Sequence, residues 1–95
     1  MSKTYKASQA FDEGAPIAIE LTPFKSSNIK AIGYDEATQT LAVTFVAGLG
    51  ALHQYPNVSK DLASDFVSAD SVGIFFGKHI KDLPFKKYRA ETAAA

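Results

Sequence analysis

The sequence predicts an α+β fold, in which a small antiparallel β-meander is packed by two helices. As far as residue 55, short runs alternate apolar and polar residues with period two, which is typical of half-buried strands. From residue 59 to residue 82, apolar residues recur at helical spacing. A run of strands followed by a run of helices favours one sheet with its helices on one side. With 95 residues, 46% of them hydrophobic, we expect a single domain.

The composition narrows the chemistry that is open to this chain. The absence of Cys excludes disulfides, thiol catalysis and thiolate metal sites. Ten basic residues balance ten acidic ones, so no global charge draws the protein to nucleic acid or to membranes. No apolar run approaches the roughly 18 to 20 residues that span a bilayer, and no apolar core follows Lys3 and Lys6 as in a signal peptide. We therefore expect a cytoplasmic protein without membrane contact, in the host cytoplasm if a phage encodes it.

The N-terminal part, residues 1–25, is predicted to be an arm with one short strand. Its first 15 residues are polar and lack periodicity. Ile17, Ile19 and Leu21 then alternate, which indicates a strand over residues 17–21 that Pro23 stops.

Three further strands are predicted over residues 28–34, 40–46 and 51–55. Gly48-Leu49-Gly50 reads as a turn between the last two, because Gly permits positive φ. The short connections favour antiparallel neighbours.

Two helices follow the strands. Ser59 is a suitable N-cap for the first helix, whose apolar face carries Leu62, Phe66 and Ala69. Asp70-Ser71 begins a second helix, which Pro84 prevents from extending far beyond Asp82. Its apolar stripe consists of Val72, Phe75, Phe76, His79 and Ile80.

The position of Phe76 at the middle of that stripe predicts that its ring lies in the central core, with Phe75 nearer the edge and His79 partly buried. Phe85 to Arg89 is a candidate edge strand, and residues 89–95 are expected to form a frayed tail.

Several motifs in residues 26–88 resemble the KTSC domain. They are Ser26-Ser27-Asn28-Ile29, Gly33-Tyr34-Asp35, His53-Gln54-Tyr55 and Ser71-Val72-Gly73-Ile74-Phe75-Phe76. That family is a small module attached to the C-terminus of some lysyl-tRNA synthetases and also found alone in short bacterial and phage proteins. The resemblance implies a suggested role in RNA binding. In this chain His53 replaces the first Tyr of the family's Tyr-x-Tyr motif.

His53 and Tyr55 are two residues apart on a strand, so their side chains leave the same face. Two rings on one sheet face can stack on exposed bases. Alternatively, Tyr55 packs under the helices with its hydroxyl hydrogen-bonded. The sequence leaves both interpretations open.

Ser26, Ser27 and Asn28 precede a strand, where short polar side chains commonly bond the local backbone. Their alternative role is a polar mouth for a phosphate, a carboxylate or a base edge. Gly73 and Gly77, four residues apart in the second helix, favour close packing over an anion cradle, because a phosphate loop would precede the helix.

The basic run near the C-terminus is the best electrostatic candidate. Basic residues interleaved with an aromatic suit a nucleic-acid backbone, whereas a solvated edge strand protected by lysines has the same appearance. The residues concerned are Lys78, Lys81, Lys86, Lys87, Tyr88 and Arg89.

No motif indicates a catalytic group, a metal site or a cofactor, so we expect a protein that is not an enzyme. The first hypothesis is an interaction module for RNA, such as tRNA, or for a nucleic-acid-associated protein. The second is a phage or bacterial accessory protein that binds a host protein through the strand at 17–21, an edge that could also form a homodimer in place of a monomer. The third is a pocket for a small anionic ligand, lined by Ser26, Ser27, Asn28, His53 and Tyr55.

Overall fold

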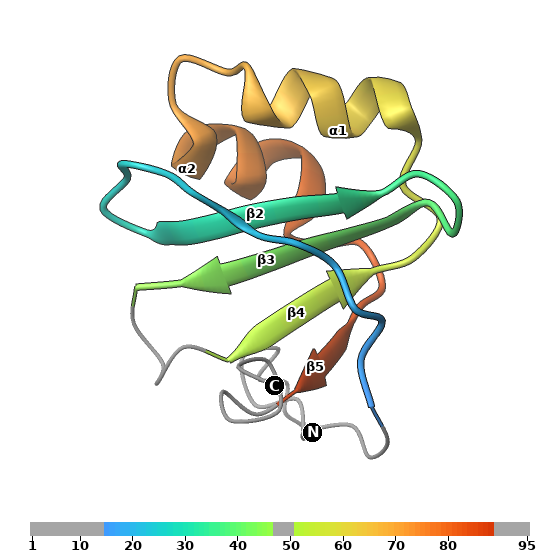
Figure 1. The fold of residues 1–95 in the computed structure, drawn as a ribbon. Helices are drawn as coiled ribbons and strands as arrows, with labels where there is room; N and C mark the ends of the chain where they lie inside the picture. Colours follow the sequence, from blue (N-terminus) through green and yellow to red (C-terminus); the bar gives the residue numbers. More distant parts are fainter. Residues whose placement is uncertain (1–14, 47–50, 89–95) are drawn as a thin grey trace, which may run out of the picture.

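The computed structural model describes residues 15–46 and 51–88, which form one five-stranded sheet with helices above it (Figure 1). In chain order the elements are β1 (Thr22–Pro23), β2 (Ile29–Asp35), β3 (Thr40–Phe45), β4 (Leu52–Tyr55), α1 (Lys60–Val67), α2 (Val72–Phe75), the π-helical segment η3 (Phe76–Ile80) and β5 (Lys86–Tyr88). The predicted α+β class is confirmed. The predicted turn at 48–50 and tail at 89–95 lie outside the described residues.

The strands follow one another across the sheet in the order β1-β2-β3-β4-β5, and every neighbouring pair is antiparallel. The predicted meander is therefore confirmed, and so is the short strand near the C-terminus. The turn between β2 and β3 ends at Gln39, whose φ of 54° is left-handed. Its carbonyl accepts a 2.9 Å hydrogen bond from the Val58 amide, which ties this turn to the segment leading into α1.

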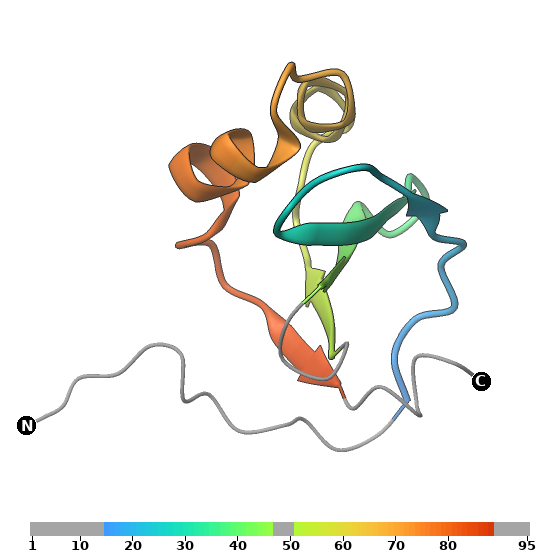
Figure 2. The same cartoon turned by 90° about the vertical axis from the view of Figure 1, so that its left-hand side faces the viewer.

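Both predicted helix starts are confirmed. The Ser59 hydroxyl accepts a hydrogen bond from the Leu62 amide at 3.1 Å, and Ser71 accepts one from Ile74 at 3.3 Å. Figure 2 shows the helices on one side of the sheet and the N-terminal segment of the described chain on the other. No helix within the described residues is both long and apolar enough to cross a membrane.

The main core lies between the sheet and the helices. Its largest fully buried side chains are Tyr55, Phe66, Ile29, Ile32, Leu41, Ile80, Val43 and Val58. The predicted central position of Phe76 is wrong: this ring is half-buried, whereas Phe66 is 0% exposed. His79, expected to be partly buried, is exposed.

A π-helical turn at the middle of the second helix accounts for the exposure of His79. The Lys81 amide donates a 2.9 Å hydrogen bond to the Phe76 carbonyl, an i to i+5 bond that places an extra residue in the turn. The 3.6-residue periodicity therefore does not continue past Phe76, whose own amide still donates to the Val72 carbonyl as in an α-helix.

The prediction of a strand at residues 17–21 is also wrong. Residues 15–21, which we name the strap, form no strand; the edge of the sheet is instead β1, two residues long. The strap crosses the face of the sheet opposite the helices (Figure 2). There Ile19 and Leu21 pack against a second cluster made of Ala42, Leu52 and Tyr88.

A side chain of the sheet holds the strap in place of a strand ladder. The Gln54 amide nitrogen donates to the Ile17 carbonyl at 2.8 Å, and the Ile17 amide donates to the Gln54 side-chain oxygen at 3.1 Å. Gly33 provides the space, because a Cβ there would lie 2.9 Å from Ile19 Cγ2 and 3.1 Å from the Glu20 carbonyl carbon. Ile19 and Leu21 thus alternate because they pack on a sheet face and not because they pair within the sheet, whereas the Ile17 side chain is exposed.

Candidate functional site: an aromatic pocket

A hollow of about 340 Å³ opens where the sheet meets the segment that follows the second helix. We name it the aromatic pocket. Most of its accessible surface is apolar, and a few polar groups lie among its rings, as in small-molecule sites. Its lining residues are Phe45, His53, Tyr55, Phe76, Lys81, Asp82 and Phe85.

Strand register brings the rings together. His53 lies opposite Val43 on β3, so Phe45, two residues further along β3, leaves the same face as His53. The Phe45 ring meets the His53 ring edge-on, with centroids 4.8 Å apart and planes at 88°. It meets Phe76 at 5.2 Å and 70°, while Phe85 lies 5.3 Å from Tyr55. These contacts give the pocket a preformed wall of rings.

The π-helical turn shapes the other side of the pocket. Phe76 begins η3 and Lys81 follows it, and both side chains line the pocket. They are the two residues joined by the i to i+5 hydrogen bond. The widened turn therefore places a ring and a cation at the same opening, and single π-turns of this kind are frequent at functional sites.

His53 is half-buried between aromatic rings, and this burial lowers its pKa below 6.5. The Lys87 ammonium lowers the pKa further, while the Ala51 backbone opposes both effects. The Nδ1 atom is buried and has no hydrogen-bond partner among the described residues.

The burial of Tyr55 supports the interpretation that this residue of the His53-Gln54-Tyr55 motif packs under the helices. The residue is 1% exposed and burial raises the pKa of its hydroxyl, so the ring offers no face on which a base could stack. The half-buried rings of Phe45, Phe76 and Phe85 provide the apolar surface of the pocket instead.

The structure divides the predicted basic run. Lys81 lines the pocket, and Lys87 lies opposite His53 in the β4–β5 pairing. Lys86 lies opposite Gln54, on the strap side of the sheet, and Tyr88 is 6% exposed against the strap cluster. Lys78 is exposed on η3 but does not line the pocket.

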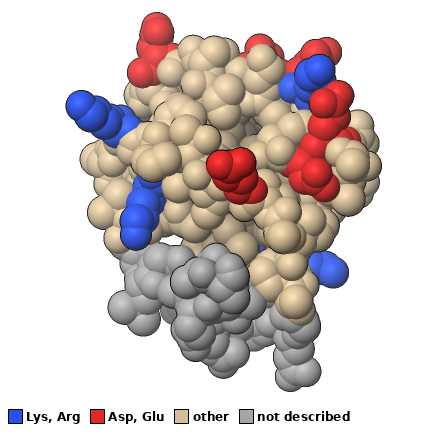
Figure 3. Space-filling view, viewed as in Figure 1, with Lys and Arg blue, Asp and Glu red and all other residues tan. Residues whose placement is uncertain are grey.

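Arg89 lies outside the described residues. Among those described, the face that carries the strap shows acidic and basic side chains together, without a large cluster of lysines (Figure 3). The pocket side carries Lys81 and Lys87 of the predicted basic run, together with the acidic Asp82.

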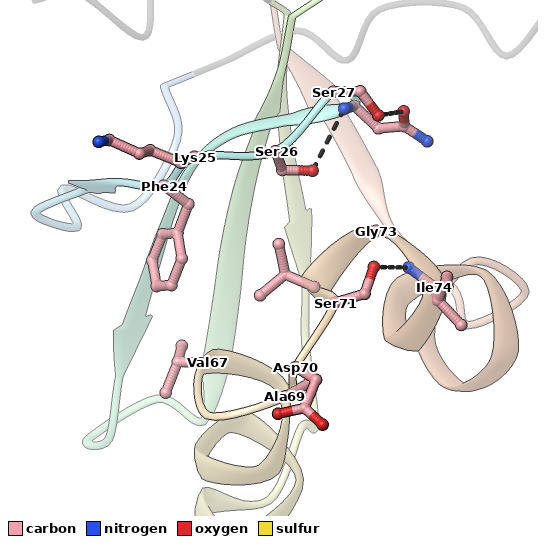
Figure 4. A pocket seen from close by; sticks show the side chains of 12 residues that line it. Phe24, Lys25, Ser26, Ser27, Val67, Ala69, Asp70, Ser71, Gly73 and Ile74 are labelled. Atoms are coloured by element: carbon pink, nitrogen blue, oxygen red, sulfur yellow. Dashed lines mark hydrogen bonds between the residues drawn. The ribbon is translucent and has the colours of Figure 1, made fainter.

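The Ser26-Ser27-Asn28 segment lies at a separate hollow of about 480 Å³, beside the first turn of α2 (Figure 4). The Ser26 hydroxyl accepts hydrogen bonds from the amides of Asn28 and Ile29, at 3.2 and 3.3 Å. The Ser27 hydroxyl donates to the Asn28 side-chain oxygen at 2.9 Å. These groups bond locally, as in a turn. They do not share a pocket with His53 and Tyr55. The prediction of one ligand pocket lined by all five residues is therefore wrong.

The two helical glycines have different surroundings. A Cβ on Gly73 would lie 3.5 Å from the Ser26 hydroxyl and 3.8 Å from Asn28, so this glycine packs against the serine turn. A Cβ on Gly77 would have nothing within 4 Å. The contacts of the first are ordinary van der Waals distances, so alanine fits at either position and close packing does not require glycine at Gly73 or at Gly77.

Four lining residues were missed from the sequence, namely Phe45, Phe76, Asp82 and Phe85. Strand alternation could have found two of them, because Phe45 shares a face with Val43, and Phe85 is two residues before Lys87. The other two positions depend on the π-helical turn. No group of three potential metal ligands occurs among the described residues.

Comparison with known proteins adds the family. A protein of Tsukamurella paurometabola is 38% identical over 61 residues, which are 64% of this chain and 88% of that protein. A protein of Stutzerimonas stutzeri is 31% identical over 67 residues, 70% of this chain and 92% of its own. A crystal structure of a KTSC domain protein from Yersinia pestis has a TM-score of 0.65 and 35% identity, and covers 76% of this chain and 97% of its own. Residues 25–85 match the KTSC domain, and the chain belongs to that family.

Proposed function

We propose that this KTSC domain is a non-enzymatic interaction module that binds a short stretch of single-stranded RNA at the aromatic pocket. The observation that supports the proposal is the convergence of half-buried rings with lysines of the basic run. The pocket combines His53 of the family motif with Lys81, and Lys87 lies opposite His53 on the neighbouring strand.

The binding mode follows from these groups. A base that enters the pocket gains contact with aromatic rings, worth about 1–3 kcal/mol for each stacked base. Lys81 and Lys87 attract the adjacent phosphates. Because the net charge of the chain is zero, affinity depends on these few local contacts, and we expect it to be modest.

The test is a titration of fluorescein-labelled single-stranded RNA, followed by anisotropy at 50 mM salt. With the two phosphate contacts of Lys81 and Lys87, the slope of log affinity against log salt should be about −1.4, so 200 mM salt should weaken binding about 7-fold. Lys81→Gln should lower the affinity and make the slope shallower. Lys30→Gln is the matched control, since Lys30 is exposed on β2, away from the pocket.

Absence of binding at 50 mM salt would contradict the proposal, and so would an equal loss of affinity in both lysine variants.

A free nucleotide is the second candidate ligand, favoured by the volume of the pocket. About 340 Å³ lies at the lower end of the range for small-molecule sites, roughly 300–1,000 Å³. A thermal-shift series with the four ribonucleoside monophosphates distinguishes a free-nucleotide site from a site for single-stranded RNA. At 100 times its dissociation constant a ligand should stabilise the fold by about 2.7 kcal/mol. A monophosphate that binds as tightly as the oligonucleotide would favour the free nucleotide.

A further inference from the structure

One charged group of the aromatic pocket is not explained by the attraction of phosphates. Asp82 lines the pocket next to Lys81, and a carboxylate repels the backbone of a nucleic acid. Both side chains are exposed, and within the part of the chain that the structure describes neither makes a hydrogen bond or an ion pair. The Asp82 carboxylate is therefore available as a hydrogen-bond acceptor at the opening of a pocket lined by rings.

We propose that the aromatic pocket selects guanine, and that Asp82 is the residue that determines this preference. The inference rests on the RNA-binding function proposed above and adds to it the base that the pocket takes. The guanine ring lies against the half-buried rings of Phe45, Phe76 and Phe85. Its N1–H and N2–H groups donate to the two oxygens of the Asp82 carboxylate.

The donor pattern of the bases is the reason for the preference. An ionised carboxylate only accepts hydrogen bonds, and it can accept two in parallel. Among the four bases of RNA, guanine alone has two neighbouring N–H donor groups on its Watson–Crick edge. Adenine and cytosine have one amino group beside a ring nitrogen that is itself an acceptor, and uracil has one N–H between two carbonyls. With these three bases the carboxylate therefore meets lone pairs, which repel it.

The placement of Asp82 suits a contact with the edge of a base. The Phe85 ring lies 5.0 Å from His53 and 5.3 Å from Tyr55, so it belongs to the wall of the pocket. The segment from Lys81 to Phe85 thus contributes a cation, an anion and a ring to one opening. A base that covers the rings presents its edge to the exposed charged residues. Partial exclusion of water by the base and the rings strengthens the hydrogen bonds made there.

The first experiment measures base preference with fluorescein-labelled uridine heptamers that differ only at the central position. Anisotropy at 50 mM salt compares guanine, hypoxanthine, adenine and cytosine at that position. The wild type should bind the guanine heptamer at least about fivefold more tightly than the adenine or cytosine heptamer. Hypoxanthine keeps N1–H but lacks the N2 amino group, so its heptamer should have an affinity between those of guanine and adenine.

The second experiment assigns the preference to Asp82. Asp82→Asn keeps the size of the side chain and removes its charge. It should lower the affinity for the guanine heptamer and raise that for the adenine heptamer, because the repulsion of phosphates and of acceptor atoms is lost. Asp65→Asn is the matched control, since it makes the same change at an exposed residue of α1 that does not line the pocket. This variant should keep the guanine preference of the wild type.

Three results would overturn the selection of guanine by Asp82 and leave RNA binding intact. They are equal affinity for the guanine and adenine heptamers, a stronger preference for cytosine, and a guanine preference that persists in Asp82→Asn. Absence of binding by every heptamer would instead overturn the proposed function, and this inference with it.

Discussion

His53 shows how a single half-buried ring can make the fold sensitive to pH. The folded protein lowers the pKa of this imidazole, chiefly through burial among rings and secondly through Lys87. The unfolded chain leaves the ring in water, with its ordinary pKa of 6.5. Below pH 6.5 the unfolded state therefore takes up the proton first.

We predict that His53 contributes stability above pH 6.5, and that this contribution falls as pH decreases from 6.5 through the lower pKa of the folded state. The sign follows because the unfolded state binds more protons in that window. Urea unfolding between pH 5 and pH 8 measures it: the wild type should lose stability below pH 6.5 more steeply than His53→Gln. His79→Gln, a change at the exposed histidine, should follow the wild type. Parallel profiles for wild type and His53→Gln would contradict the prediction.

Substitution of two phenylalanines tests the difference between a core residue and a pocket residue. Phe66 is 0% exposed, so Phe66→Ala should cost about 3–5 kcal/mol of unfolding free energy, much of the stability of a small domain. Phe76 is half-buried and lines the pocket, so Phe76→Ala should cost less but weaken RNA binding. Denaturant unfolding and RNA titration of the two variants test this. The reverse order of stabilities would return Phe76 to the central core.

At the scale of the element, the second helix carries a glycine for which packing gives no reason. A glycine within a helix is less favourable than alanine by about 0.5–1 kcal/mol, and a Cβ at Gly77 would occupy open space. We therefore predict that Gly77→Ala raises the unfolding free energy by about that amount. Gly73→Ala should gain a similar amount, because its Cβ would lie at an ordinary van der Waals distance of 3.5 Å from the Ser26 hydroxyl. Thermal unfolding of both variants is the measurement; destabilisation by Gly77→Ala would show that the π-helical turn itself requires glycine.

The strap should leave the sheet without unfolding it. We predict that Gly33→Ala accelerates hydrogen exchange of the Ile17 amide, which is hydrogen-bonded to Gln54, because the added Cβ displaces the neighbouring backbone. Amides in the centre of β3 should keep their protection. Gly77→Ala is the control. Unchanged exchange at Ile17 in Gly33→Ala would mean that the strap adapts to the added methyl group.

At the scale of the whole molecule, local rules predicted most of the fold. Alternation in β2, β3 and β4, and the serine caps at Ser59 and Ser71, depend on neighbours in sequence, which a reader of the sequence can see. The strap was mistaken for a strand because any extended segment packed on a surface alternates. Its hydrogen bonds run to Gln54, 37 residues away, and leave no local signal.

The site was harder to predict than the fold. The two-residue period of a strand predicted that His53 and Tyr55 share a face. Their separation from Ser26 depends on how distant segments of the chain pack, which the sequence does not show. The basic run looked continuous in sequence, yet the pleat of β5 places Lys86 and Lys87 opposite Gln54 and His53, on different faces. The π-helical turn, which brings Phe76 and Lys81 together, has no recognisable sequence signature here.

The two faces of strand β4 make different contacts. His53 and Tyr55 line the pocket on one face, and Gln54 is hydrogen-bonded to the strap on the other. Substitutions at these positions can therefore accumulate independently during evolution, and either surface can be remodelled while the other is kept. A one-residue insertion or deletion within the strand has no such freedom. It would turn the glutamine toward the rings and a ring toward the strap, and so disable both surfaces in a single event.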